Sequence, residues 1–190
     1  TWVSYGTADG LMDNPSKMLV TREGIVWVAG SHQAQTATAY FEPFALSAQV
    51  KPWVMKIHAD FSPRGIDPNA VFQSSDGSLW FGSAGGLRQE HLGGMLRFDS
   101  RNWVCYTSSE ALPVSYAIGQ TPDGIMWIGG DKLRRFDGKT WASILAPAGL
   151  TSWIHDIRVT DDGVLWIGTR TYGLFHFDGE NWQQHNVQDG

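Results

Sequence analysis

Apolar and aromatic residues recur along the chain in short runs that alternate with polar residues and are separated by Asp-Gly pairs. The last repeat predicts four consecutive strands, at residues 157–159, 164–168, 173–177 and 182–185. Asp162-Gly163, between the first two, is the kind of pair that favours a tight hairpin turn. The second strand is apolar on both faces, because Leu165 and Ile167 point one way and Trp166 the other. Such a strand needs cover on both sides, so the pattern predicts an antiparallel four-stranded meander packed between neighbours.

The same pattern occurs four times. Each copy has an acidic residue, Gly, two further residues, Trp, an aliphatic or aromatic residue and a small one, at residues 23–29, 76–82, 123–129 and 162–168. A second Trp follows each copy, clearly at Trp103, Trp141 and Trp182 and more weakly at Trp53, and Trp2 starts this series. A four-stranded sheet that repeats every 40–50 residues or so is the signature of a β-propeller blade. A β-sandwich, the alternative, would have one polar face per strand and no fixed period.

We interpret the chain as a single all-β propeller segment over residues 1–190. Its repeat units are approximately 2–52, 53–102, 103–140 and 141–181, with 182–190 as the final strand. Counting strands gives four complete blades plus one spare fourth strand at residues 2–5. If the four blades closed alone, two strands would compete for one position. We therefore expect part of a larger propeller, and completion of the ring by association of chains is the alternative.

The repeats carry the motifs Asp-Gly-x-Leu-Trp-Ile-Gly-Thr and Gly-Leu-x-x-Phe-Asp-Gly. Residues 162–169 and 173–182 match them almost letter for letter, residues 123–141 match well, and residues 76–103 match around an insertion. On these motifs the chain resembles the two-component regulator propeller repeat family. The first unit departs from the pattern, because Glu23 replaces Asp and the second motif is lost between residues 30 and 52. The resemblance implies a periplasmic or extracytoplasmic sensor domain of a bacterial two-component or hybrid histidine kinase system, with a small molecule, often a glycan fragment, as ligand.

Composition narrows the partners further. Lys and Arg number 14 and Asp and Glu 19, which gives a net charge of −5, and no window carries a basic run, so we expect no nucleic acid. No run approaches the roughly 18 apolar residues of a membrane helix. None of the six His residues pairs with a second His or a Cys at metal-binding spacing, and the Asp-Gly pairs are explained as hairpin residues. We therefore expect no metal and no cofactor.

In a meander, the connection between the second and third strands lies at the same end of the blade as the link to the next blade. Insertions at residues 31–39 and 83–91 are therefore expected on one rim, where a rigid scaffold presents variable loops. We take this rim as the candidate ligand-binding site. Its members are His32, Gln33, Arg88, Glu90, His91, Lys132, Trp153, Arg170 and Tyr172. The rings of Trp153 and Tyr172 suit the apolar face of a sugar, and eight of the ten Trp residues are assigned to the core by their period.

These observations predict a non-catalytic recognition propeller that binds a small molecule on this rim. Two alternatives stay open. A protein-interaction propeller would be favoured by an exposed apolar patch without a pocket. A propeller lyase or hydrolase would need His and carboxylate side chains near the central channel, for which His155 and Asp156 are the candidates. Self-association, or pairing with the rest of a propeller, is expected from an open arc of blades.

Overall fold

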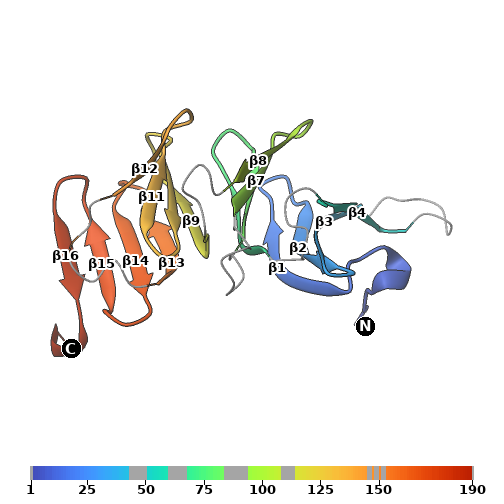
Figure 1. The fold of residues 1–190 in the computed structure, drawn as a ribbon, viewed down its shortest axis with the longest axis horizontal. Helices are drawn as coiled ribbons and strands as arrows, with labels where there is room; N and C mark the ends of the chain where they lie inside the picture. The colour runs from blue at the N-terminus through green and yellow to red at the C-terminus, as the bar shows by residue number, and fades with distance from the viewer. Residues whose placement is uncertain are drawn as a thin grey trace.

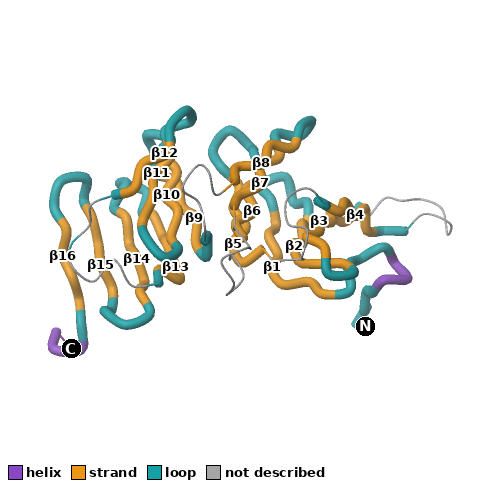
Figure 2. The backbone as a smooth tube through the Cα atoms, in the orientation of Figure 1, coloured by secondary structure: helices purple, strands orange, loops and turns teal. Residues whose placement is uncertain are grey.

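The computed structural model describes residues 2–42, 51–59, 68–83, 94–107, 114–144, 147, 150 and 153–189. These residues form four antiparallel sheets of four strands, each sheet in chain order, with two short 3-10 turns at residues 7–9 and 187–189 (Figures 1 and 2). We call the sheets blades 1 to 4. The all-β fold of consecutive meanders confirms the sequence prediction, including the four strands expected for the last repeat.

The strands of blade 1 are β1 (Asn14–Val20), β2 (Val26–His32), β3 (Gln35–Phe41) and β4 (Trp53–Ile57). Blade 2 contains β5 (Pro68–Gln73), β6 (Leu79–Ser83), β7 (Gly94–Phe98) and β8 (Trp103–Thr107). Blade 3 contains β9 (Ala117–Gln120), β10 (Met126–Gly129), β11 (Leu133–Phe136) and β12 (Trp141–Ser143). Blade 4 contains β13 (Ile154–Val159), β14 (Leu165–Thr169), β15 (Leu174–Phe177) and β16 (Trp182–His185).

The hydrophobic core lies between the blades. The second-strand Trp of each of the first three blades faces the next blade, where it meets an aliphatic or aromatic strand. Trp27 thus packs in one cluster with Leu79 and Phe81, and Trp127 in another with Leu165 and Ile167. The repeat therefore buries a strand that is apolar on both faces by placing a blade on each side of it.

Blade 4 has no following blade among the described residues. Trp166, at the position of the three buried second-strand Trp residues, is only half-buried, and Leu174 on the same face is 39% exposed. His176 and His185 stack against Trp166, and His176 Nδ1 lies 3.0 Å from His185 Nε2. We call this surface the open face of blade 4.

The spare fourth strand expected at residues 2–5 is not formed. Residues 2–6 belong to no strand, and Trp2 is fully exposed. Tyr5 instead packs on Phe41 at 5.3 Å and on Trp53 at 6.0 Å between ring centroids, and Met12 is buried on the same face of blade 1. The physical reason is that a short strand needs a free sheet edge to pair with, whereas the ring of Tyr5 needs only an apolar surface to pack on.

The first insertion was also misplaced. Residues 31–32 and 35–39 belong to β2 and β3, which are joined by a two-residue turn at Gln33 and Ala34. Both turn residues have positive φ, 49° and 61°, as short hairpins require. β3 ends at Phe41 and β4 begins at Trp53, and residues 43–50 between them lie outside the described residues. The second predicted insertion lies, apart from Ser83, outside the described residues.

Candidate functional site

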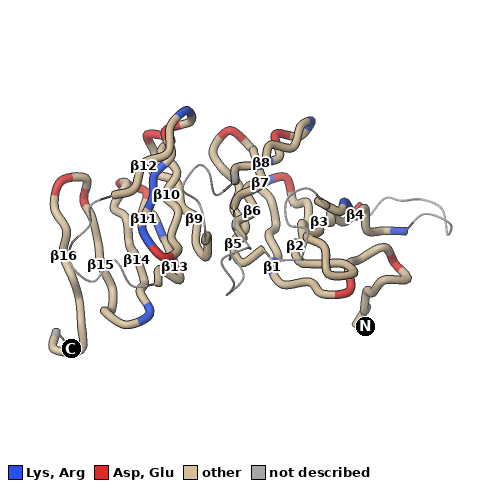
Figure 3. The backbone as a smooth tube through the Cα atoms, viewed as in Figure 1, with Lys and Arg blue, Asp and Glu red and all other residues tan. Residues whose placement is uncertain are grey.

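Each blade has two kinds of end. The turns between first and second strands and between third and fourth strands form what we call the turn rim. The connections between second and third strands and the links between blades form the loop rim, which is the rim predicted to bind a ligand. Figure 3 shows that acidic residues gather along the upper edge of the view, where the turn rim lies.

Three predicted residues come together on the loop rim between blades 3 and 4. Lys132 lies in the turn between β10 and β11, and Ile154 donates from its backbone N to the carbonyl of Gly130 in that turn at 2.8 Å. Arg170 donates from its backbone N to the carbonyl of Trp153 at 2.9 Å. This chain of backbone hydrogen bonds places Lys132, Trp153 and Arg170 on neighbouring loops.

Trp153 belongs to an aromatic group that the sequence did not indicate. Its ring meets Tyr116 edge-on at 5.6 Å, and His155 stacks on the same tyrosine at 5.3 Å with 18° between the planes. Trp153 is 39% exposed. We call Tyr116, Trp153 and His155 the aromatic platform. A partly exposed ring fixed by its neighbours offers a ligand a flat surface at a low cost in side-chain entropy.

The other predicted residues are dispersed or lie elsewhere. His32 and Gln33 are in blade 1, where the backbone N of Gln33 donates to Asp13 Oδ2 at 3.1 Å and His32 Nδ1 lies 3.6 Å from Asp13 Oδ1, too far for a hydrogen bond. Tyr172 is 50% exposed in the turn after β14. Arg88, Glu90 and His91 lie outside the described residues.

The turn rim is organised by a repeated hydroxyl group that sequence reasoning missed. Ser74 Oγ donates toward Asp76 Oδ1 and Ser78 O and accepts from the buried indole Nε1 of Trp80 at 3.1 Å. Thr121 makes the equivalent contacts in blade 3, including one from Trp127 Nε1 at 3.2 Å. The signal was present, since Thr or Ser stands three positions before the Gly of every repeat.

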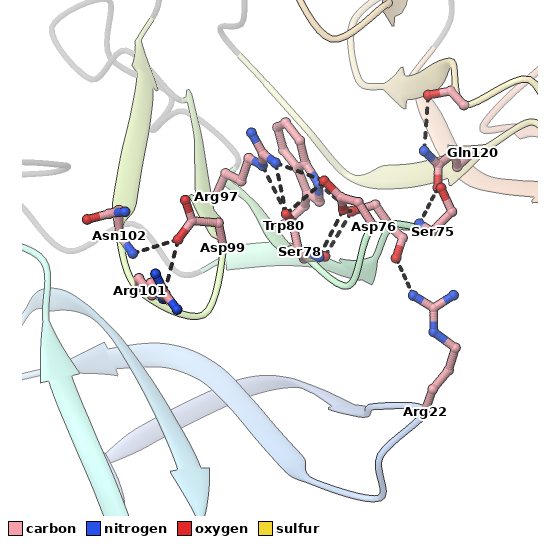
Figure 4. Close-up of polar contacts among 12 residues, drawn as sticks. Arg22, Ser75, Asp76, Ser78, Trp80, Arg97, Asp99, Arg101, Asn102 and Gln120 are labelled. Atoms are coloured by element: carbon pink, nitrogen blue, oxygen red, sulfur yellow. Dashed lines mark hydrogen bonds and ion pairs between the residues drawn. The ribbon is translucent and has the colours of Figure 1, made fainter.

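Blade 2 carries an extended polar network on this rim (Figure 4). The guanidinium of Arg97 contacts Asp76 Oδ2 at 2.8 Å and Ser78 Oγ at 2.9 Å, and it lies 5.5 Å from the centre of the Trp80 ring. Burial alone would raise the pKa of Asp76, but hydrogen bonds from Ser74 and Ser78 and the charge of Arg97 lower it. The carboxylate of Asp76 therefore stays ionised, and its oxygens are engaged by Ser74, Ser78 and Arg97 of the same blade.

Three equivalent grooves open between the blades on the turn rim. Each is walled by an acidic residue, the second-strand Trp and a third-strand residue of one blade, and by a turn Gly and a Phe of the next. The acidic residue, the Trp and the third-strand residue are Glu23, Trp27 and Tyr40 in the groove between blades 1 and 2. They are Asp76, Trp80 and Arg97 between blades 2 and 3, and Asp123, Trp127 and Arg135 between blades 3 and 4. We number these grooves 1 to 3 in chain order. Their volumes are about 550, 170 and 480 Å³.

The described part of the chain has neither a clustered set of metal ligands nor a membrane-crossing helix. It contains no group of three or more His, Cys, Asp or Glu side chains arranged to hold a metal ion. It also contains no helix long and apolar enough to cross a membrane. The Asp residues of the turns are occupied by their own loops, as at Asp178, which accepts from the backbone N of Glu180 and Asn181.

No protein-family model matches the sequence, and no curated protein matches it either. Solved structures do match its fold. PorZ, a surface component of the type-IX secretion system of Porphyromonas gingivalis, matches with a TM-score of 0.68 and 14% identity over 93% of this chain and 28% of its own. Virginiamycin B lyase of Staphylococcus aureus matches with a TM-score of 0.68 and 17% identity over 93% of this chain and 57% of its own.

The extracellular domain of a hybrid two-component system from B. thetaiotaomicron also matches, with a TM-score of 0.66 and 16% identity over 95% of this chain and 24% of its own. The chain thus spans from about a quarter to just over half of these proteins' length. At such identities the likeness shows the fold, and the neighbours' different roles mean that the fold alone does not fix the function. The chain has the architecture of part of a β-propeller.

Proposed function

We propose that the chain is a non-catalytic recognition segment of a β-propeller and binds a small molecule, such as a glycan fragment, on the loop rim. The observation that carries the proposal is the aromatic platform, with Trp153 partly exposed and Lys132 and Arg170 on the loops beside it. An aromatic face packs against the apolar face of a sugar ring, and the flanking cations supply hydrogen-bond donors to its hydroxyl or carboxylate oxygens.

We further propose an extracytoplasmic sensor role. It is supported by the repeat motifs, which resemble the two-component regulator propeller repeat, and by the structural likeness to an extracellular domain of a hybrid two-component system. In such a protein, a ligand held between two blades favours one packing arrangement of the sensor chains over another. The signal is then a shift between conformational states, and no catalysed reaction is needed.

Calorimetry against a panel of neutral and acidic oligosaccharides tests the binding. We expect heat with at least one member, and Trp153→Ala should lower the affinity about ten-fold or more while leaving the melting temperature close to that of the parent chain. Trp2→Ala is the matched control, because Trp2 is fully exposed and far from the platform in sequence and contacts. Absence of heat, with a purified protein partner binding the same rim, would overturn the proposal.

The open face of blade 4 favours a second candidate, a propeller that uses blade faces to bind protein. Trp166 and Leu174 leave apolar surface there that the first three blades bury. A further blade, from the same protein or from another copy, is the occupant that fits the repeat. Measurement of the mass in solution tests association, and a monomer at high concentration argues against pairing of two copies.

The enzyme alternative rests on His155. Its ring stacks on Tyr116, and within the described residues it has no hydrogen bond or ion pair to a carboxylate. Asp156, its neighbour, accepts from the backbone N of Ile157 and lies 3.4 Å from Arg158 Nε. Turnover of a lyase or hydrolase substrate that is lost in His155→Ala would establish catalysis in place of recognition.

A further inference from the structure

The three grooves of the turn rim share one scaffold and differ at one position. The second-strand Trp pairs across the ladder with Tyr40 in blade 1, Arg97 in blade 2 and Arg135 in blade 3. The acidic residue that precedes the Trp by four positions stands beside that partner in each groove. Among the described residues, the acidic group and the residue opposite the Trp form an ion pair in blade 2, between Asp76 and Arg97.

In groove 2 the chain supplies its own cation. The Arg97 guanidinium lies over Trp80 and is bonded to Asp76 and Ser78, so it fills the space between the indole and the carboxylate. Groove 2 has a volume of about 170 Å³, compared with about 550 Å³ for groove 1 and about 480 Å³ for groove 3, where Arg135 forms no described ion pair with Asp123. A guanidinium is thus accommodated by an acidic residue and aromatic walls on this scaffold.

Groove 1 has a similar acidic and aromatic lining without the cation, and Ile25 stands where blade 2 has Ser78. Tyr40 packs against Trp27 at 5.0 Å with 34° between the ring planes, in place of the guanidinium, and Glu23 replaces Asp76. Glu23 Oε2 accepts from Gln73 Nε2 at 2.9 Å but forms no ion pair with any described residue. That hydrogen bond is the main reason why the pKa of Glu23 is lowered. The carboxylate is therefore charged at neutral pH and open to a partner.

The charge of Arg22 contributes to lowering the pKa of Glu23, but the two side chains form no described ion pair. The nearest cation, Arg22, directs its guanidinium to the carbonyl of Ser74 in blade 2. Asp76 lines the far wall, and Glu42 accepts from the Tyr40 hydroxyl. Groove 1 therefore combines an ionised carboxylate with the aromatic walls of Trp27, Tyr40 and Phe98, which is the setting in which an organic cation is held.

We propose that groove 1 binds a guanidinium group from outside the chain, bonded to Glu23 and packed against Tyr40, as Arg97 is held from within in groove 2. The source is a free guanidinium compound or an arginine side chain of a peptide. The site is independent of the proposed function, because it lies on the turn rim and shares no residue with the aromatic platform.

The test is an NMR titration of the full chain with N-acetylarginine amide, with the neutral isostere N-acetylcitrulline amide as the ligand control. We expect the indole signal of Trp27 and the amide signal of Glu23 to move with arginine and not with citrulline. A pentapeptide, Gly-Gly-Arg-Gly-Gly, distinguishes the sources. Binding at least ten-fold tighter than the amide indicates a peptide partner, and equal binding indicates a small molecule.

Two variants and one control sharpen the test. Glu23→Gln should weaken arginine binding about ten-fold or more, because it removes the charge from a charge-assisted hydrogen bond. Tyr40→Arg should weaken binding, because it places a cation of the chain itself beside Glu23. Glu180→Gln makes the same change on the same rim away from groove 1 and should leave binding unchanged. Equal weakening by both Glu→Gln variants, or equal binding of citrulline, would overturn the proposal.

Discussion

Replacing the hydroxyl of Thr121 with a methyl group tests whether buried indole hydrogen bonds hold the turns of the propeller together. Thr121 Oγ1 contacts Asp123 Oδ1 at 2.5 Å and Ile125 O at 3.2 Å, and it accepts from Trp127 Nε1 at 3.2 Å. Thr160 Oγ1 makes the equivalent contacts to Asp162 and Val164 O in blade 4. The described contacts include no bond from the Trp166 indole to Thr160.

Thr121→Val and Thr160→Val are therefore a matched pair that differs mainly in the indole. Trp127 is 6% exposed, so its N–H loses the one partner it has among the described residues and gains little water, which costs about 1–3 kcal/mol. Thr160 is exposed and Trp166 half-buried, so water replaces what is lost there. We expect Thr121→Val to lower the free energy of unfolding by about 2 kcal/mol and Thr160→Val by about 0.5 kcal/mol or less.

Urea unfolding followed by tryptophan fluorescence measures the difference. With an m value of about 2 kcal/mol per molar, the midpoint should fall by about 1 M for Thr121→Val and by about 0.25 M for Thr160→Val. The m value itself should stay constant, because neither change alters the surface exposed on unfolding. Equal shifts in the two variants would refute the argument, since the contacts they share would then account for the whole effect.

Three further outcomes are expected. Burial, with a smaller contribution from the charge of Lys56, lowers the pKa of His58 from 6.5 to about 4. Between pH 6.5 and pH 4 the unfolded chain therefore binds a proton on His58 that the folded chain does not bind. Stability from this group is therefore complete above pH 6.5 and is lost as the pH falls toward 4, by at most about 3 kcal/mol, and His58→Gln should flatten that part of a stability profile. Phe175→Ala should cost about 3–5 kcal/mol in urea unfolding, because Phe175 is wholly buried between blades 3 and 4. Changing Gln33 and Ala34 together to Asn-Gly should stabilise the chain by about 1 kcal/mol, since both have positive φ, and an unchanged melting temperature would contradict the turn assignment.

The period of the sequence predicts the blades well because one physical requirement repeats four times. A strand that is apolar on both faces needs a neighbour on each side, and the Asp-Gly turns set where the chain reverses. The last repeat, which has short connections throughout, was predicted strand by strand. The first repeat was not, because Ser31 to Ala39 carry small and polar residues that read as a loop. Thr36 and Thr38 are nevertheless buried in β3, where the sheet satisfies their backbone and Thr38 Oγ1 lies 2.9 Å from His58 Nε2.

The site could be predicted only in part, because it depends on contacts between blades. In a four-stranded meander the connection between the second and third strands lies at the same end as the link to the next blade. This places Lys132, Trp153 and Arg170 on one rim, and the blade links bring them together. The partner of Trp153 is Tyr116, from the link before β9, and no local pattern connects the two. The grooves of the turn rim were missed for the same reason, since each takes one wall from each of two blades.

The residue opposite the second-strand Trp shows how such a scaffold changes its function without changing its core. That position holds Tyr40, Arg97, Arg135 and His176 in the four blades, while the Trp beside it is constant. It lies at the mouth of a groove and not at the centre of an interblade cluster, so substitution there costs little packing. Arg97 closes its groove with an internal ion pair, and His176 instead contacts His185 on the open face of blade 4. An Arg at this position fills its groove where it pairs with the acidic residue, as Arg97 does with Asp76, whereas the groove beside Arg135 keeps about 480 Å³.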